Sequence, residues 1–247
     1  MNFPRNIFQT WKTDTVPDNW KEGQQSVIKM NPGWKYTLLT DADNDRIVKE
    51  NFPDFYQTFI SLKYPIQRAD AIRYCVLYLY GGIYLDLDFI CNKSFDDLYL
   101  NKEVGLTRSI TDHKYTNCFM ISQPRSQFWL YCIEYMNSNK QLPFYKRLTM
   151  HYYVFNTCGP GMLHTIAKKY PNYIQDFKNI QVNCGVCNQN KFYNNCKVDT
   201  RYYLTPLPGN SWHTVWDSKI MINLYCNRNI IIIFIIIIIL YLFNKKK

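Results

Sequence analysis

Asp86 and Asp88 are the residues of this sequence whose types and spacing best suit chemistry. They follow a short apolar run that begins at Gly81-Gly82. Successive side chains of a β-strand point to opposite faces, so two residues separated by one position share a face. Carboxylate oxygens are preferred ligands of Mg²⁺ and Mn²⁺. A strand over residues 83–88 therefore predicts that Asp86 and Asp88 hold Mn²⁺ or Mg²⁺ together with a phosphate of the substrate.

The residues ahead of this pair predict a helix that positions two more charged side chains. Apolar residues recur at helical spacing over residues 65–80, and a proline stands at the first position. Asp70 and Arg73 are three positions apart and so share a face of this helix. They could form a structural ion pair, or both could face the substrate. The two glycines permit a sharp turn from the helix into the strand.

Together these residues resemble the sugar-binding signature of the DXD-containing glycosyltransferases of family 32. That family includes the Golgi initiating α-1,6-mannosyltransferases and the inositol phosphorylceramide mannosyltransferases, and large glucosylating toxins share its signature. The similarity continues over most of residues 3–165, although Phe8 stands where the family has His and Cys158 is inserted in a T-G-P-G loop. The signature positions are Asp70, Arg73, Tyr74, Leu77, Tyr78, Tyr80, Gly81, Gly82, Ile83, Tyr84, Asp86 and Asp88.

The resemblance implies a role for each candidate side chain around a nucleotide-sugar. Trp11 would stack on the base, with core packing as the alternative. Asp88 would bind the metal directly, and Asp86 would reach the metal or the ribose through water. Asp70 would accept hydrogen bonds from sugar hydroxyls, and Arg73 would contact the sugar or the diphosphate.

A segment near residue 213 resembles the family's closing His/Ser-Trp segment, which lies over the diphosphate as a lid. The resemblance implies that His213 and Trp216 help to bind the donor. For His213, metal or phosphate binding competes with a purely structural role.

The activity implied is metal-dependent hexosyl transfer with retention of the anomeric configuration. We expect mannose to move from GDP-mannose to a glycan or glycolipid acceptor, although UDP-glucose, UDP-galactose and UDP-GlcNAc stay open as donors. A different class of function is a catalytically inactive, membrane-bound protein that binds sugar nucleotides or glycans. Such a protein is expected to have lost a carboxylate of the pair, and both are present here.

The order of expected elements predicts an α/β fold of the GT-A type. Strands alternate with helices, which favours a Rossmann-like, mostly parallel sheet with helices on both faces and a ligand at the carboxyl ends of the strands. We expect one glycosyltransferase domain over residues 1–220 and a hydrophobic tail over 221–247. Strands are expected at 3–10, 35–40, 83–88, 103–107 and 118–122, and helices at 18–30, 42–50, 55–62, 65–80, 127–136 and 161–169.

The charge and the cysteines narrow the set of partners. The formal net charge of +10 favours anionic partners such as nucleotide diphosphates or acidic membrane surfaces. No nucleic-acid motif accompanies it, so we expect no nucleic-acid partner. Cys184, Cys187 and Cys196 could bind a structural zinc ion or form a disulfide.

The C-terminal end carries an apolar run over residues 230–243, followed by three lysines near the terminus. As a helix the run would be roughly 21 Å long, short of the ~30 Å hydrocarbon core, although snorkelling lysines could close the gap. We therefore expect a single-pass anchor in a Golgi- or ER-type endomembrane, with its orientation left open. Met1 leads almost directly into the family pattern, so no N-terminal signal sequence is expected.

Overall fold

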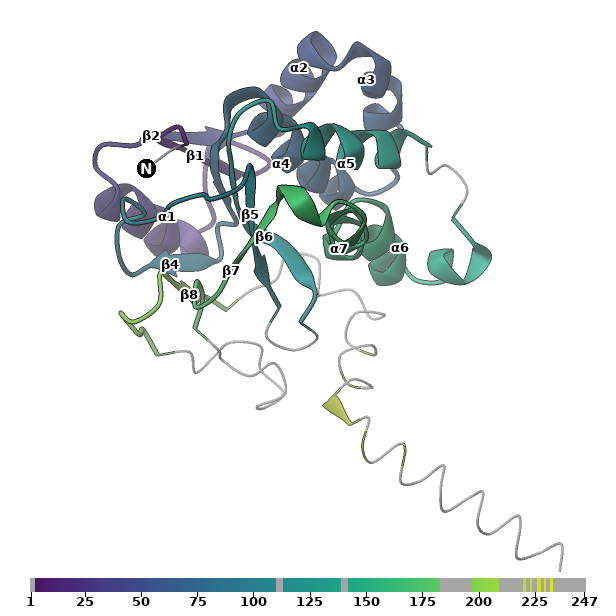
Figure 1. Ribbon diagram of the computed structural model, residues 1–247. Coiled ribbons are helices and arrows are strands. Elements are labelled where there is room, and N and C mark those ends of the chain that lie inside the picture. Colours follow the sequence, from purple (N-terminus) through teal and green to yellow (C-terminus); the bar gives the residue numbers. More distant parts are fainter. Residues whose placement is uncertain are drawn as a thin grey trace, which may run out of the picture.

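A mixed six-stranded sheet forms the centre of the computed structural model (Figure 1), in the order β2-β1-β3-β6-β5-β7. The structure describes residues 3–109, 113–138, 142–182 and 197–208, and residues 220, 223, 226, 227, 229 and 232. A second sheet pairs β4 with β8. The strands are β1 (Asn6–Thr10), β2 (Lys35–Leu39), β3 (Gly82–Leu85), β4 (Phe89–Cys91), β5 (Val104–Arg108), β6 (Tyr115–Ser122), β7 (Ile174–Phe177) and β8 (Leu204–Pro206).

Three of the five pairings in the large sheet are parallel: β1 with β2, β1 with β3, and β5 with β7. The sheet is nevertheless mixed, because β6 runs antiparallel to both β3 and β5. The chain between β5 and β6 is short, and a short connection can join only antiparallel strands. The expectation of a mostly parallel sheet is therefore confirmed, with β6 as the exception.

Two layers cover the sheet. The helices α4, α5 and α7 pack on one face, where Tyr84 and Met120 point, and α1 packs on the other face with Ile83 and Ile121. This division follows from the alternation of side chains along β3 and β6. The helices are α1 (Asp18–Met30), α2 (Asp41–Asn51), α3 (Pro53–Ile60), α4 (Pro65–Tyr80), α5 (Gln127–Ser138), α6 (Met150–Thr157) and α7 (Pro160–Lys169), with 3₁₀ turns η1 (Phe144–Arg147) and η2 (Pro171–Tyr173).

Helix α4 has the limits that its sequence predicts. Pro65 occupies its first turn, and the side chain of Gln67 accepts a hydrogen bond from the backbone N–H of Tyr64 at 3.0 Å. The helix ends at Gly81, with φ of 60°, and Gly82 follows with φ of 101°. Both values lie in the left-handed region that glycine tolerates best. The chain thus reverses at once and enters β3.

Replacing Gly82 by alanine is expected to lower the free energy of unfolding by about 2 kcal/mol or more. A Cβ at this position would lie 2.5 Å from the carbonyl oxygen of Asn6. Urea denaturation of Gly82→Ala measures the loss. Gly33→Ala is the matched control, because its Cβ would lie 3.7 Å from Arg5 Nη1 and its φ is not positive. Equal urea midpoints for the two variants would contradict the prediction.

The expected strand over residues 83–88 is too long. β3 ends at Leu85, where its register with Phe119 also ends, so Asp86 and Asp88 lie in the turn beyond the strand. Asp86 still donates its backbone N–H to the Cys118 carbonyl at 2.9 Å, whereas the Asp88 carbonyl accepts from Leu207 at 2.8 Å. The chain is drawn toward the second sheet, so strand alternation does not place Asp88.

Other limits differ from the sequence-based expectation by a few residues, and some elements were not expected. The sequence-based expectation did not include the strands β4, β7 and β8 or the helix α6. Strands of three or four residues are too short to display a period. The division into a domain over 1–220 and a tail over 221–247 stays a prediction.

The predicted single-pass C-terminal span is not supported. Among the residues that the structure describes, no helix combines the length and the hydrophobicity that crossing a bilayer demands. Apart from residue 232, the segment 230–243 lies outside the described residues. The prediction that this span places the protein in a membrane is therefore wrong.

Candidate active site

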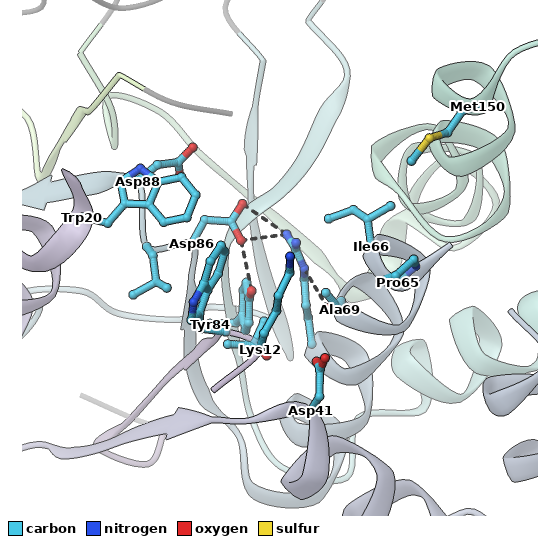
Figure 2. A pocket seen from close by; sticks show the side chains of 14 residues that line it. Lys12, Trp20, Asp41, Pro65, Ile66, Ala69, Tyr84, Asp86, Asp88 and Met150 are labelled. Carbon is cyan, nitrogen blue, oxygen red and sulfur yellow. Dashed lines mark hydrogen bonds and ion pairs between the residues drawn. The ribbon is translucent and has the colours of Figure 1, made fainter. Parts of the chain in front are cut away.

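A cavity of about 300 Å³ opens where β1, β2 and β3 end (Figure 2). These three strands are parallel, so the residues that follow them meet at one edge of the sheet, where ligands of such sheets bind. Helix α4 and the start of α6 complete the walls. The lining residues are Thr10, Trp11, Lys12, Trp20, Asp41, Pro65, Ile66, Ala69, Arg73, Tyr84, Asp86, Leu87, Asp88 and Met150.

Arg73 is the hub of the polar contacts in this cavity. Its Nη1 lies 3.0 Å from Asp86 Oδ1 and donates to the carbonyl of Asn117 at 2.9 Å. Its Nη2 lies 3.1 Å from Asp70 Oδ1, and its Cζ lies over the Tyr84 ring, 4.8 Å from the ring centre. The guanidinium thereby ties α4 to the end of β3 and to β6. It places a fixed positive charge against the cavity.

Asp70 lies behind Arg73 and does not line the cavity. Its side chain is 6% exposed, and its Oδ1 also accepts from the Asn117 amide at 2.9 Å. That amide lies 3.3 Å from the hydroxyl of Tyr74, which donates to the Cys158 carbonyl at 2.7 Å. Burial raises the pKa of Asp70 to about 6, against the opposing effect of the Arg73 charge. The ion pair on the helix is therefore real, and the predicted contact of Asp70 with sugar hydroxyls stays a prediction.

Asp86 is held in one orientation by its neighbours. Besides Arg73, the hydroxyl of Tyr84 donates to its Oδ1 at 3.0 Å, and Gln9 donates to its backbone carbonyl at 3.1 Å. Burial raises the pKa of Asp86, and the Arg73 charge opposes this shift. The carboxylate keeps 27% of its side-chain surface exposed, toward the cavity that it lines.

Asp88 differs from Asp86 because one of its oxygens has no protein partner. Its Oδ1 is buried and receives no hydrogen bond. Burial, and after it the charge of Asp86, raises the pKa of Asp88 to about 8. A buried carboxylate without a partner is costly, so this oxygen has the environment of a group that a bound cation would satisfy.

The two carboxylates suit a divalent cation only if other ligands complete its coordination shell. Within the described residues, no cluster of three or more His, Cys, Asp or Glu side chains is arranged to hold a metal ion. Mg²⁺ typically keeps few protein ligands and completes its shell with water and substrate phosphate oxygens. The donor set is therefore that of a cation which binds together with a phosphate-bearing substrate.

Trp11 borders the cavity directly after β1. Its ring meets that of Trp20 edge-on, with centroids 5.0 Å apart, and Lys12 Nζ lies 5.7 Å from its centre. Its backbone N–H donates to the Leu39 carbonyl at 3.0 Å, which fixes the residue to the end of β2. Trp11 is partly exposed and lines the cavity, and it also packs against the small buried cluster of Val16, Trp20 and Leu87, so its stacking on a base stays a prediction.

The structure brings four of the predicted site residues into one cavity: Trp11, Arg73, Asp86 and Asp88. Asp70 supports them from behind. The predicted His213 and Trp216 lie outside the described residues. So do the three cysteines of the zinc or disulfide prediction: Cys184, Cys187 and Cys196.

Sequence reasoning assigned no role to three residues that the geometry places in or beside the site. Tyr84 lies two positions before Asp86, so strand alternation could have indicated their contact. Lys12 follows Trp11 directly, and a cation next to a stacking residue is a usable signal for a phosphate group. Asn117 is only a weak candidate from the sequence, because only the pairing of β3 with β6 brings it to Arg73.

Comparison with known proteins agrees with this geometry. The family described as "Glycosyltransferase sugar-binding region containing DXD motif" matches residues 17–105, which include Arg73, Asp86 and Asp88. Inositol phosphoceramide mannosyltransferase 1 of Schizosaccharomyces pombe is 30% identical over 234 residues, which cover 94% of this chain and 68% of that protein. The chain belongs to this family of DXD glycosyltransferases. The resemblance that the sequence indicated is thereby confirmed.

Other relatives of this DXD glycosyltransferase are longer than the chain. Mannosyl phosphorylinositol ceramide synthase CSH1 of Saccharomyces cerevisiae is 34% identical over 211 residues, which cover 85% of this chain and 53% of that protein. The chain thus spans about half the length of this relative. Among solved structures, the PaToxG glycosyltransferase aligns with a TM-score of 0.54 and 19% identity over 68% of this chain and 70% of that one. This likeness supports the glycosyltransferase fold that the sequence predicted.

Proposed function

We propose that this DXD glycosyltransferase transfers mannose from GDP-mannose to a glycolipid or glycan acceptor, with retention of the anomeric configuration. The observation that carries the proposal is the buried, unpartnered Oδ1 of Asp88, next to Asp86 in the cavity where three parallel strands end. Relatives named inositol phosphoceramide mannosyltransferases support mannose as the sugar and a lipid as the acceptor.

The proposed reaction exchanges one bond at the anomeric carbon for another. The acceptor hydroxyl oxygen bonds to that carbon, and the bond from the carbon to the diphosphate oxygen breaks. The hydroxyl proton leaves with the diphosphate or to solvent. A cation held by Asp86 and Asp88, Mn²⁺ or Mg²⁺, would offset the negative charge that develops on the diphosphate.

The side chains of the cavity supply the remaining electrostatics. Arg73 is fixed by Asp70, Asp86 and the Asn117 carbonyl, so its charge needs no reorganisation when the diphosphate departs. Lys12 adds a second, exposed positive charge at the cavity. Tyr84 holds Asp86 in one orientation.

A donor-hydrolysis screen of the full chain tests the proposal. We expect GDP-mannose to be turned over faster than UDP-glucose, UDP-galactose or UDP-GlcNAc in the presence of Mn²⁺. A chelator is expected to abolish turnover, and added Mn²⁺ to restore it. Faster turnover of a UDP-sugar would show that GDP-mannose is not the donor. If none of the four nucleotide-sugars is turned over, the catalytic proposal is rejected. In that last case, binding of GDP-mannose by calorimetry would identify an inactive sugar-nucleotide-binding protein.

Trp11→Ala is expected to raise the KM for the donor about tenfold, whereas Trp11→Phe retains most of the affinity. Stacking of an aromatic ring on a base contributes about 1–3 kcal/mol, and phenylalanine keeps a ring. Initial rates at varied GDP-mannose concentration give both KM values. Urea denaturation serves as the control, since Trp11 also packs on Trp20. An unchanged KM for Trp11→Ala in a folded protein would reject the stacking role.

A further inference from the structure

The turn η1 and the residues after it expose large hydrophobic side chains just before helix α6. Phe144 is 74% exposed, Leu148 61% and Tyr145 57%. Phe144 and Leu148 are the most exposed large hydrophobic side chains among the described residues. Other exposed apolar residues are spread singly over the chain, which is normal for a protein surface. A cluster of three within five positions is different.

This cluster, Phe144, Tyr145 and Leu148, is continuous with the wall of the active site. Met150 begins helix α6 only two positions after Leu148, and it lines the cavity with Pro65 and Ile66. Figure 2 shows Met150 and Ile66 on the side of the cavity away from Asp88. In Figure 1 the turn between α5 and α6 projects from the edge of the domain. Met150 thus connects the apolar wall of the cavity to this projecting turn.

The charged residues of the chain segment that contains the cluster have one sign. No aspartate or glutamate occurs between Glu134 and Asp176, whereas this stretch contains five lysines and arginines: Lys140, Lys146, Arg147, Lys168 and Lys169. Arg147 is exposed within the turn itself. Lys63 is also exposed, and its Nζ lies 5.1 Å from the ring of Tyr64, which packs on Tyr153 of α6. Two exposed basic side chains, Arg147 in the turn and Lys63 beside α6, therefore accompany the cluster.

We propose that the cluster docks on an anionic lipid bilayer and inserts Phe144, Tyr145 and Leu148 at the interface. Exposed aromatic and aliphatic side chains accompanied by basic residues suit the headgroup region, where burial of apolar area and attraction to anionic lipids add. The inference rests on the proposed transfer to a lipid-linked acceptor and deepens it. Docking at this turn would place the apolar wall of the cavity toward the lipid surface.

The basic residues favour an acidic partner for this face. A second copy of the chain is the competing occupant. Copies of a cationic surface repel each other across a two-fold interface, which favours the anionic bilayer. The test therefore includes the oligomeric state.

Co-sedimentation of the full chain with lipid vesicles tests the proposal. Phe144→Ser combined with Leu148→Ser is expected to lower the partition onto phosphatidylcholine vesicles that contain phosphatidylinositol by about tenfold or more. The control combines Ile28→Ser with Tyr99→Ser, which are 45% and 53% exposed in the wild type and lie away from the turn. We expect this control to bind as the wild type does. Equal losses for both double variants would overturn the proposal.

Hydrogen exchange with and without vesicles locates the contact. Peptides that cover residues 142–150 are expected to exchange more slowly on vesicles that contain phosphatidylinositol, and less so at high salt. An unchanged rate there would overturn the proposal even if another segment carries the binding. A change in the oligomeric state of the Phe144/Leu148 double variant would also overturn the proposal, because the cluster would then contact a second copy of the chain. We expect the same rate of donor hydrolysis in solution for the wild type and all these variants. A protein that hydrolyses no donor would reject the proposed function, whatever the result of the vesicle experiments.

Discussion

Asp88→Asn is expected to lower donor turnover by at least about 100-fold and to leave the protein folded. The Oδ1 of Asp88 accepts no hydrogen bond and lies near the charge of Asp86. Asparagine removes the carboxylate that would bind the cation, without breaking a hydrogen bond to that oxygen. Turnover of GDP-mannose with Mn²⁺ and the thermal midpoint, both measured on the purified variant, check the two parts of the prediction.

Asp86→Asn is the matched comparison, because the same chemical change there removes a charge that is paired. Asp86 accepts hydrogen bonds from both Arg73 and Tyr84. Loss of its charge is therefore expected to lower turnover and also to lower the free energy of unfolding by about 1–3 kcal/mol. If Asp88→Asn turns over the donor as the wild type does, Asp88 is not part of the metal site. If it destabilises as much as Asp86→Asn, its carboxylate has a structural partner.

Arg73→Ala is expected to lower the free energy of unfolding by about 3–5 kcal/mol and to abolish turnover. Arg73 is 5% exposed and contacts two carboxylates, one on its own helix and one after β3. Without it, the buried Asp70 keeps only the Asn117 amide as a described partner, and the Asn117 carbonyl loses its donor. Urea denaturation followed by far-UV circular dichroism measures the loss of stability.

Arg46→Ala provides the control, since Arg46 forms an ion pair with Asp43 at the same spacing of three residues along a helix. The two side chains of that pair are 60% and 35% exposed, and exposed pairs contribute little. We expect its urea midpoint to match the wild type. Arg73→Lys separates charge from shape, because lysine keeps the charge but lacks the planar fork that reaches three partners. Full activity in Arg73→Lys would show that charge alone is needed.

The sequence was sufficient to predict helix α4, its ending at the two glycines and the charged residues beyond them. These features rest on local physics: helical spacing, the tolerance of glycine for positive φ, and the position of proline. The prediction failed where tertiary contacts decide. β3 stops at Leu85 because the chain beyond it is bound to residues near β8, and a pattern of alternating residues contains no such information.

The role of Asp70 shows the same limit from another side. Its position three residues before Arg73 predicted a shared helix face, and their ion pair is present. Asn117, which arrives from β6, donates to the same oxygen of Asp70 that Arg73 contacts, and the two hold this carboxylate behind the cavity. Long-range pairing of strands therefore decides which of two adjacent charges reaches the cavity.

The contrast between the two carboxylates has a consequence for the order of assembly. Asp86 already pairs with Arg73, so the protein is expected to keep its native state after dialysis against a chelator. The single unsatisfied oxygen of Asp88 gives little affinity for a free ion, and phosphate oxygens raise that affinity. Asp86 and Asp88 would therefore hold a cation chiefly when a phosphate-bearing substrate supplies further oxygens, so that occupancy of the site would follow the supply of substrate.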